Sequence, residues 1–212
     1  MHEISKNKEP NILAKYRMVL GSVFDGGDFT VVKDAIKKSL LDEQGYTCAY
    51  CMNGIKASNM KVEHWASRKT HPNLQLTYTN LLGCCKGNEG EPKENQCCDT
   101  RKGNSPIKYS PAEPNDHINK TIIYLGDGRI KSNDISFNEE INLILNLNLD
   151  RQVKNRLEAI IRVKRSLAIK DGNRSQENIV KMISKINKRN GNNKFIPYYG
   201  IMLHYLSKKL RG

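Results

Sequence analysis

All six cysteines of this 212-residue chain fall within one segment, residues 48–98. Cys48 and Cys51 have the C-x-x-C spacing that lets two thiolates take adjacent corners of a tetrahedron around zinc. The other four form two doublets of adjacent residues, Cys84-Cys85 and Cys97-Cys98. A zinc ion held by four thiolates has no open coordination position, so it ties together loops that have little hydrophobic core of their own. This segment is therefore expected to fold around a structural Zn²⁺ ion.

The doublets leave open which cysteines bind the metal. Neighbouring side chains on an extended segment point to opposite faces, so one cysteine from each doublet is expected to reach it. The favoured ligand set is Cys48, Cys51, Cys85 and Cys98. Cys84 and Cys97 are then spare, and each is the alternative to its neighbour.

The chain carries no signature of membrane insertion or secretion. No run of about 18 apolar residues is present, and residues 1–17 lack the apolar core of a signal peptide. We therefore expect a cytoplasmic protein with no membrane partner. Thiols stay reduced in the cytoplasm, which favours metal ligands over disulfide bonds as the role of the cysteines.

Turn-forming residues and changes of hydrophobic periodicity divide the chain into three parts. Residues 1–29 are mixed and polar, and we expect an irregular lead-in there. Residues 30–110 hold the cysteines and are expected to form a small domain. Residues 111–212 are expected to form a β-hairpin followed by a basic, helical C-terminal domain. The fold class that follows is α+β.

Within the central part, short elements alternate with loops. Residues 30–41 carry apolar side chains on helical spacing, which predicts a helix leading into the first cysteine pair. Residues 60–65 alternate as a strand does, and residues 75–78 suggest a second short extended piece. Residues 86–96 are wholly polar, with two glycines and a proline, and predict a loop.

In the third part, residues 121–131 carry two apolar runs around Gly-Asp-Gly, which predicts a β-hairpin. Apolar residues three and four apart then predict four helices, at residues 137–147, 151–170, 176–189 and 198–210. A break at Asp171–Asn173 separates the second of these helices from the third. The apolar faces of those two helices are expected to pack on each other.

The net charge of +13 is confined to the end of the chain. Residues 1–150 carry 19 Lys and Arg against 19 Asp and Glu, whereas residues 151–212 carry 16 against 3. A helical segment with this imbalance is typical of contact with nucleic acid or with an acidic partner protein. A solvated basic face is the third possibility, and the sequence does not choose among them.

Three residues of the central part, Glu63, His64 and Asp99, combine groups that phosphodiester hydrolysis needs. An imidazole with a pKa near neutrality can deprotonate the attacking water. Carboxylates can hold a hard divalent cation, which neutralises charge at the phosphate and stabilises the leaving oxygen. A metal bound to Cys98 would hold the adjacent Asp99 next to Glu63. We therefore expect a candidate nuclease site that uses Mg²⁺ or Mn²⁺.

Residues 48–102 resemble the HNH endonucleases in the motifs CAYC, VEHW, NLLGCC and QCCDTRK. The chain is similar in particular to the PtuB type, the nuclease subunit of Septu anti-phage systems that also accompanies some retrons. The resemblance implies a zinc-stabilised ββα-metal core within residues 30–110, preceded by a leading helix. It implies hydrolysis of nucleic acid, either DNA or RNA. It also implies an ABC-type ATPase partner of the PtuA type and, in a retron, a reverse transcriptase/msDNA complex.

The same resemblance implies a role for each matching residue. His64 would be the general base that activates water, and Glu63 and Asp99 would bind the catalytic divalent ion. Asn80 would pin the loop beside His64 through bonds from its side chain to the backbone. Lys102 would contact substrate phosphate.

The competing hypothesis is a non-catalytic zinc module that binds nucleic acid or serves as an adaptor. Glu63, His64 and Asp99 argue against it, because a binding module has no need for that set. The chain departs from the commonest HNH pattern in carrying Asp at position 99, where Asn or His is usual. Asp is a better ligand for Mg²⁺ than Asn, so the departure does not remove the chemistry.

Overall fold

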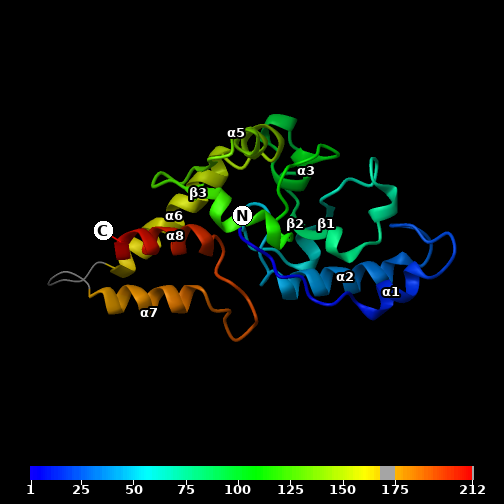
Figure 1. Cartoon of the computed structure of the whole chain (residues 1–212), viewed down its shortest axis with the longest axis horizontal. Helices are drawn as coiled ribbons and strands as arrows, with labels where there is room; N and C mark the ends of the chain where they lie inside the picture. The colour runs from blue at the N-terminus through cyan, green and yellow to red at the C-terminus, as the bar shows by residue number, and fades with distance from the viewer. Residues whose placement is uncertain (168–174, 212) are drawn as a thin grey trace.

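The structure, a computed structural model, describes residues 1–167 and 175–211 (Figure 1). The predicted end of the second C-terminal helix at Lys170 and the predicted break at Asp171–Asn173 lie outside the described residues. Among the described helices, none is long and apolar enough to cross a membrane.

The centre of the chain folds as two strands followed by a short helix. Strand β1 (Met60–His64) pairs antiparallel with β2 (Leu81–Cys85), and helix α3 (Cys98–Lys102) packs against β2. The strand predicted at residues 60–65 is therefore confirmed to within one residue. The α+β class is confirmed as well, and the order β1, β2, α3 is consistent with the expected ββα core.

The second strand lies elsewhere than predicted. Residues 75–77 run between two turns of 3₁₀ helix, Pro72–Leu74 and Tyr78–Asn80, the second of which begins at Tyr78, and the strand begins only at Leu81. Four of the five residues in β2 are buried. A strand that is buried on both faces does not alternate apolar and polar residues, so its sequence lacks the period of two.

Helix α2 (Phe29–Glu43) packs against both strands and confirms the helix predicted at residues 30–41. Just after its end, the buried side chain of Gln44 contacts the edge of β2. Gln44 Oε1 accepts a hydrogen bond from Gly83 N (2.6 Å), and Nε2 donates one to Gly83 O (2.8 Å). This pair of bonds holds β2 against the end of α2 in the way that a neighbouring strand would.

Residues 1–29 are less irregular than expected. They contain α1 (Asn11–Arg17), which buries Leu13 and packs against α2. A helix this short presents too few apolar positions for a period to show in the sequence. Ahead of α1, Lys6 forms an ion pair with the buried carboxylate of Glu43. This part of the chain therefore contributes to the protein core.

The third part contains the predicted hairpin and the predicted helices. Strands β3 (Ile122–Tyr124) and β4 (Ile130–Ser132) pair antiparallel, and the short α4 (Ile118–Thr121) precedes them. The helices that follow are α5 (Ile135–Glu139), continued by a π-helical turn at Glu140–Ile144, then α6 (Asp150–Leu167), α7 (Gln176–Ile186) and α8 (Tyr199–Arg211). Each lies within a few residues of its expected bounds, as far as the described residues extend.

Helix α8 lies between α6 and α7 and packs against both (Figure 1). The expectation that the faces of α6 and α7 pack mainly on each other is therefore wrong. An apolar face accepts whichever apolar neighbour the path of the chain supplies, and helical spacing alone does not name that neighbour. Helix α6 is joined to the hairpin by the buried Arg156, which donates to Gly128 O (2.6 Å) and to Leu147 O (2.7 Å).

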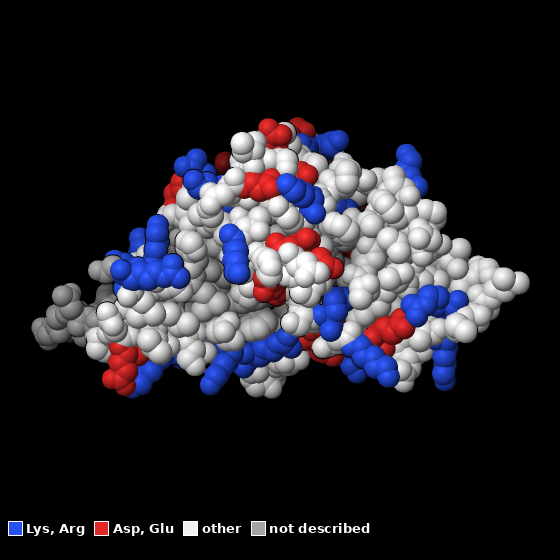
Figure 2. All heavy atoms as spheres, viewed as in Figure 1, with Lys and Arg blue, Asp and Glu red and all other residues white. Residues whose placement is uncertain are grey.

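Figure 2 shows how charge is distributed over one face of the molecule. Lys and Arg side chains stand out over the end formed by α6, α7 and α8, and several Asp and Glu side chains lie nearer the middle. The imbalance in the sequence thus becomes a basic surface on the helical part.

Candidate active site

The four favoured cysteines meet at one point. The cluster of Sγ atoms, all within 4.8 Å of one another, consists of Cys48, Cys51, Cys85 and Cys98. The Sγ atoms of Cys51 and Cys85 are 3.8 Å apart. In a tetrahedral site with Zn–S bonds of about 2.3 Å, the sulfur atoms are about 3.8 Å apart, so this cluster could hold a structural zinc. Cys97, from the second doublet, instead accepts a hydrogen bond from Gln152 Nε2 (3.3 Å).

Two backbone contacts fix the second half of the cluster. Cys97 N donates to Gly87 O (2.9 Å), which closes the polar loop. Gly87 has a φ of +54°, and a Cβ there would lie 2.0 Å from Cys97 O, so no other residue fits without a shift of the backbone. The amide of Cys98 donates to Leu145 O (2.9 Å). The cluster therefore depends on a glycine in the loop and on a contact from the third part of the chain.

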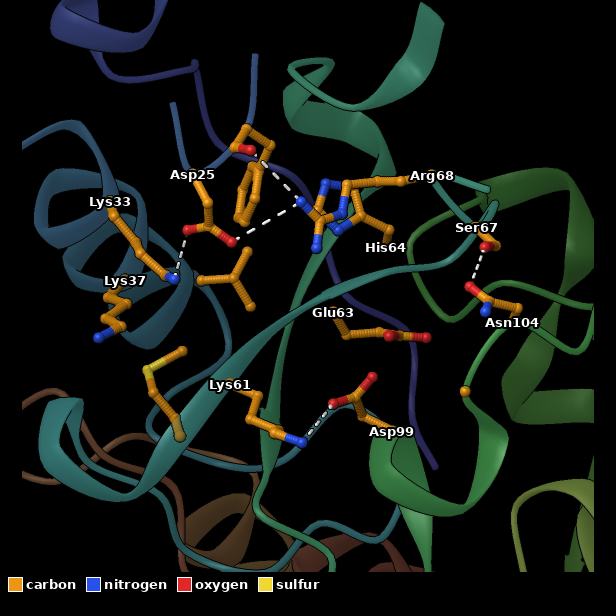
Figure 3. Close-up of a pocket in the computed structure, with 14 residues that line it drawn as sticks. Asp25, Lys33, Lys37, Lys61, Glu63, His64, Ser67, Arg68, Asp99 and Asn104 are labelled. Atoms are coloured by element: carbon orange, nitrogen blue, oxygen red, sulfur yellow. Dashed lines mark hydrogen bonds and ion pairs between the residues drawn. The ribbon is translucent and has the colours of Figure 1, made fainter. Parts of the chain in front are cut away.

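Glu63, His64 and Asp99 line one cleft, which has a volume of about 400 Å³ (Figure 3). Strand β1 supplies Glu63 and His64 at its end, and Asp99 lies in the first turn of α3. Because Asp99 directly follows Cys98, the cysteine cluster and the cleft are adjacent in the chain. The structure thus brings together the three residues that the sequence singled out.

Glu63 is a buried carboxylate with two donors on the same oxygen. Its Oε1 accepts a hydrogen bond from Tyr50 OH (2.9 Å) and forms an ion pair with Lys102 Nζ (2.7 Å). Figure 3 shows the Asp99 carboxylate facing that of Glu63. Burial raises the pKa of Glu63 well above its usual range, Asp99 adds to this effect, and Lys102 opposes it. A cation between the two carboxylates would relieve the unfavourable burial of charge.

His64 is held in one orientation by two contacts. Its Nε2 lies 2.9 Å from Gln75 O, and its ring packs edge-on against Phe24 at 4.4 Å. A carbonyl oxygen can only accept, so Nε2 carries the proton and Nδ1 of the neutral ring is the basic nitrogen. Burial lowers the pKa of His64 from 6.5 to about 4, so the ring is neutral at physiological pH.

Asn80 fixes the loop that follows β1. Its Oδ1 accepts from Ala66 N (2.8 Å), while Nδ2 donates to Ala66 O (3.0 Å) and Leu74 O (3.2 Å). Its own carbonyl accepts from Trp65 N (3.0 Å). The loop between β1 and β2 includes Gln75, whose carbonyl orients His64, so Asn80 stabilises the segment that positions the imidazole.

Lys102 does not lie where the resemblance places it. The residue is only 1% exposed, and Nζ contacts Glu63 Oε1 and His64 O (3.2 Å). An ammonium group enclosed in this way has no surface to offer to a phosphate in the cleft. The physical reason is helical geometry: Lys102 lies three residues after Asp99, almost one turn of α3 further on, and so faces the same buried carboxylate.

Sequence reasoning missed several residues of the site. Tyr50 lies inside the C-x-x-C motif, but no pattern marked its hydroxyl as a partner of Glu63. Other residues around the cleft come from the first part of the chain, from α2, from β1 and from the loop after β1; they are Phe24, Asp25, Lys33, Lys37, Lys61 and Arg68. They share no spacing that a sequence motif could capture, because only the tertiary structure brings them together.

No protein-family model matches this chain. It is 30% identical over 122 residues to the protein of retron Vc95 from Vibrio cholerae serotype O1 biovar El Tor that is named as an HNH endonuclease. It is 31% identical over 134 residues to the Septu protein PtuB of Bacillus thuringiensis. These matches cover 54% and 59% of this chain, and 58% and 46% of the relatives. The chain therefore spans about half the length of the curated relatives it matches.

The two relatives carry the names that the sequence motifs suggested, one from a retron and one from a Septu system. The predicted resemblance of this chain to HNH endonucleases of the PtuB type is thereby confirmed.

Proposed function

We propose that this protein is a metal-dependent HNH endonuclease that hydrolyses phosphodiester bonds of nucleic acid. The observation that carries the proposal is the meeting of Glu63, His64 and Asp99 in one cleft. A basic nitrogen beside two carboxylates supplies both a proton acceptor and a site for a hard cation. The names of the two relatives support the same chemistry.

In this proposal His64 accepts the proton of the attacking water through Nδ1. The Gln75 carbonyl holds the opposite nitrogen protonated, so the basic nitrogen is the one free to act. The low pKa keeps the His64 ring in the neutral form that can accept a proton, but at about 4 it also makes the ring a weaker base than the near-neutral imidazole expected from the sequence. Asn80 is a positioning residue, since it holds the loop that carries this carbonyl.

Glu63 and Asp99 are the proposed ligands of a catalytic Mg²⁺ or Mn²⁺ ion. Their oxygens are the donor type that these ions prefer, and the contacts of Tyr50 and Lys102 with Glu63 are made through Oε1. When bound, such an ion would neutralise charge at the phosphate and stabilise the leaving oxygen. We propose that Lys102 positions Glu63 rather than contacting substrate.

The cysteine cluster is the proposed structural Zn²⁺ site. Its four sulfur atoms link the turn before β1, the end of β2 and the start of α3. These are the elements that hold the catalytic residues, so zinc would keep Asp99 beside Glu63 without taking part in the chemistry.

The proposed biological setting is defence against phage. One relative is named for a retron and the other for a Septu system, which favours an effector nuclease of such a system. An ABC-type ATPase of the PtuA type is the proposed partner. The basic surface over α6, α7 and α8 is available for that partner or for nucleic acid.

Cleavage of DNA and RNA by His64→Ala, compared with the unchanged chain in Mg²⁺ or Mn²⁺, tests the proposal. The matched control is His71→Ala, since His71 is an exposed histidine of the neighbouring loop. Assays are run with and without an ABC-type ATPase of the PtuA type, the proposed partner. We expect His64→Ala to lose at least about 100-fold in rate, as removal of a general base does, and His71→Ala to retain activity. Equal cleavage by the two variants would refute the role of His64.

The alternative, a zinc-containing nucleic-acid-binding or adaptor module, makes the opposite prediction. Both variants and the unchanged chain would then bind nucleic acid equally, and none would cut it under any condition.

A further inference from the structure

Asp25 lies among the cations that line the cleft. Its carboxylate contacts Lys33 Nζ (2.6 Å) and Arg68 Nη1 (3.7 Å), and all three residues line the same cleft as His64. Figure 3 shows Asp25 between Lys33 and Arg68, with Glu63 and Asp99 together in another part of the cleft. The cleft therefore has one end where Glu63 and Asp99 meet, with Lys61 Nζ 3.7 Å from Asp99, and a basic end that Asp25 neutralises only in part.

We infer that Lys33 and Arg68 form a phosphate-binding subsite for the nucleic-acid strand, and that Asp25 fills this subsite when no strand is bound. The inference rests on the proposed nuclease function, because it names the contact for a phosphate next to the one that is cut. A strand that runs along the cleft passes from the end with Glu63 and Asp99 to the basic end, so a neighbouring phosphate reaches the two cations.

The contacts of Asp25 are of a kind that a phosphate can replace. The side chains of Asp25, Lys33 and Arg68 are 46%, 34% and 45% exposed. Exposed ion pairs of this type contribute little to stability and are screened by salt. Both a carboxylate and a phosphodiester present two oxygens that share one negative charge, and the guanidinium fork fits either.

Arg68 is held in place independently of Asp25. Its Nη1 donates to Phe24 O (3.4 Å), and its guanidinium lies over the Phe24 ring at 4.8 Å. Phe24 is itself buried and packs against Phe29 and His64. When Asp25 moves aside, the arginine therefore stays at the edge of the cleft, ready for a phosphate.

Lys37 extends the basic end of the cleft. It lies four residues after Lys33, one turn further along α2, and lines the same cleft. Helix α2 thus presents two lysines in a row at the spacing of one helical turn. Helix α2 therefore does more than cover the strand pair, because it also supplies cations to the cleft.

The test is equilibrium binding of the full chain to a fluorescent DNA duplex, its single strands and the matching RNA. Mg²⁺ and Mn²⁺ are left out so that no strand is cut. Asp25→Asn removes the competing charge but keeps a residue type that tolerates the positive φ of 63° at this position. We expect affinity to rise about threefold or more. Arg68→Gln and Lys33→Gln should each lower the affinity. Each should also reduce the steepness of the plot of log affinity against log salt concentration by about 0.7–0.9, the contribution of one phosphate contact.

The matched control is Asp127→Asn, which removes an equally exposed carboxylate that pairs with Arg129 in the hairpin turn. If Asp127→Asn tightens binding as much as Asp25→Asn, the effect is only that of net charge and the subsite is refuted. The subsite is also refuted if the gain from Asp25→Asn persists in a chain that carries both Lys33→Gln and Arg68→Gln.

Failure of the subsite and failure of the nuclease proposal give different results. Cleavage that depends on His64, combined with no specific effect of Asp25→Asn, refutes the subsite alone. A specific effect of Asp25→Asn on binding, without any cleavage, supports the subsite and refutes the catalytic role. A chain that binds none of the probes refutes both.

Discussion

The two strands with α3 differ from the helical C-terminal part in the residues that stabilise them and in their surface charge. The first combines buried apolar strand residues with buried polar groups such as Glu63 and Lys102 and with a cluster of cysteines. The second is strongly basic outside and packs through apolar faces on α8. The residues that line the candidate cleft all lie between Phe24 and Asn104, in the part of the chain with no net charge. Net charge therefore does not locate the cations that face the site.

The largest effect is expected from loss of a proposed zinc ligand in the first region. Cys98→Ser should lose the zinc and unfold the segment around it, because structural zinc contributes about 10–16 kcal/mol, more than most domains have to spare. Zinc content and circular dichroism measure this. Cys84→Ala is the matched control, a buried cysteine outside the cluster, and should keep one zinc per chain. Loss of zinc in the control would mean that Cys84, and not Cys85, binds the metal.

The next effect concerns the buried ion pair. Lys102→Met leaves the Glu63 carboxylate without its cation, which should cost about 3–5 kcal/mol of unfolding free energy. Urea denaturation measures it. Arg101→Met, one residue earlier in α3, removes hydrogen bonds to the carbonyls of Lys93 and Leu143 but leaves no buried charge unpaired, so it should cost less than Lys102→Met. Similar costs for the two variants would mean that the Glu63–Lys102 ion pair contributes no more to stability than the contacts of Arg101 do.

Acid should destabilise the protein through His64. Its pKa is about 4 in the folded chain and 6.5 ordinarily, so as pH falls below 6.5 the unfolded chain takes up the proton first. The free energy of unfolding should therefore fall between about pH 6.5 and pH 4, by about 2 kcal/mol at pH 5. In His64→Asn this component should vanish, whereas in His71→Asn it should stay. Identical pH profiles for all three chains would contradict the burial of the imidazole.

The smallest expected effect is on nucleic-acid binding, and it compares a lysine of the cleft with a lysine of the helical C-terminal part. Lys37→Gln in the cleft should weaken nucleic-acid binding a few-fold, whereas Lys185→Gln on α7 should leave it nearly unchanged. Fluorescence anisotropy at two salt concentrations measures both. A larger loss in Lys185→Gln would reverse the comparison and make the helical part the main nucleic-acid surface.

Local patterns predicted most of the elements but not the second strand. The helix at α2, the strand β1 and the hairpin of β3 and β4 follow from spacings within a few residues. The second strand, by contrast, is buried on both faces, so the period that marks a half-buried strand is absent. The partner of the apolar faces of α6 and α7 was also misjudged, because such a face does not encode which surface will cover it.

The sequence by itself determined the chemistry that is available: six cysteines, of which one pair has a metal-binding spacing, and the set of Glu63, His64 and Asp99. Only the tertiary structure decided how that chemistry is arranged. It put the Sγ atoms of Cys85 and Cys98 in the cluster with the first cysteine pair, enclosed Lys102, and brought Asp25 and Arg68 together across the cleft. The reason is physical: residue type and spacing act over one turn or one strand, whereas burial and charge pairing depend on segments far apart in the chain.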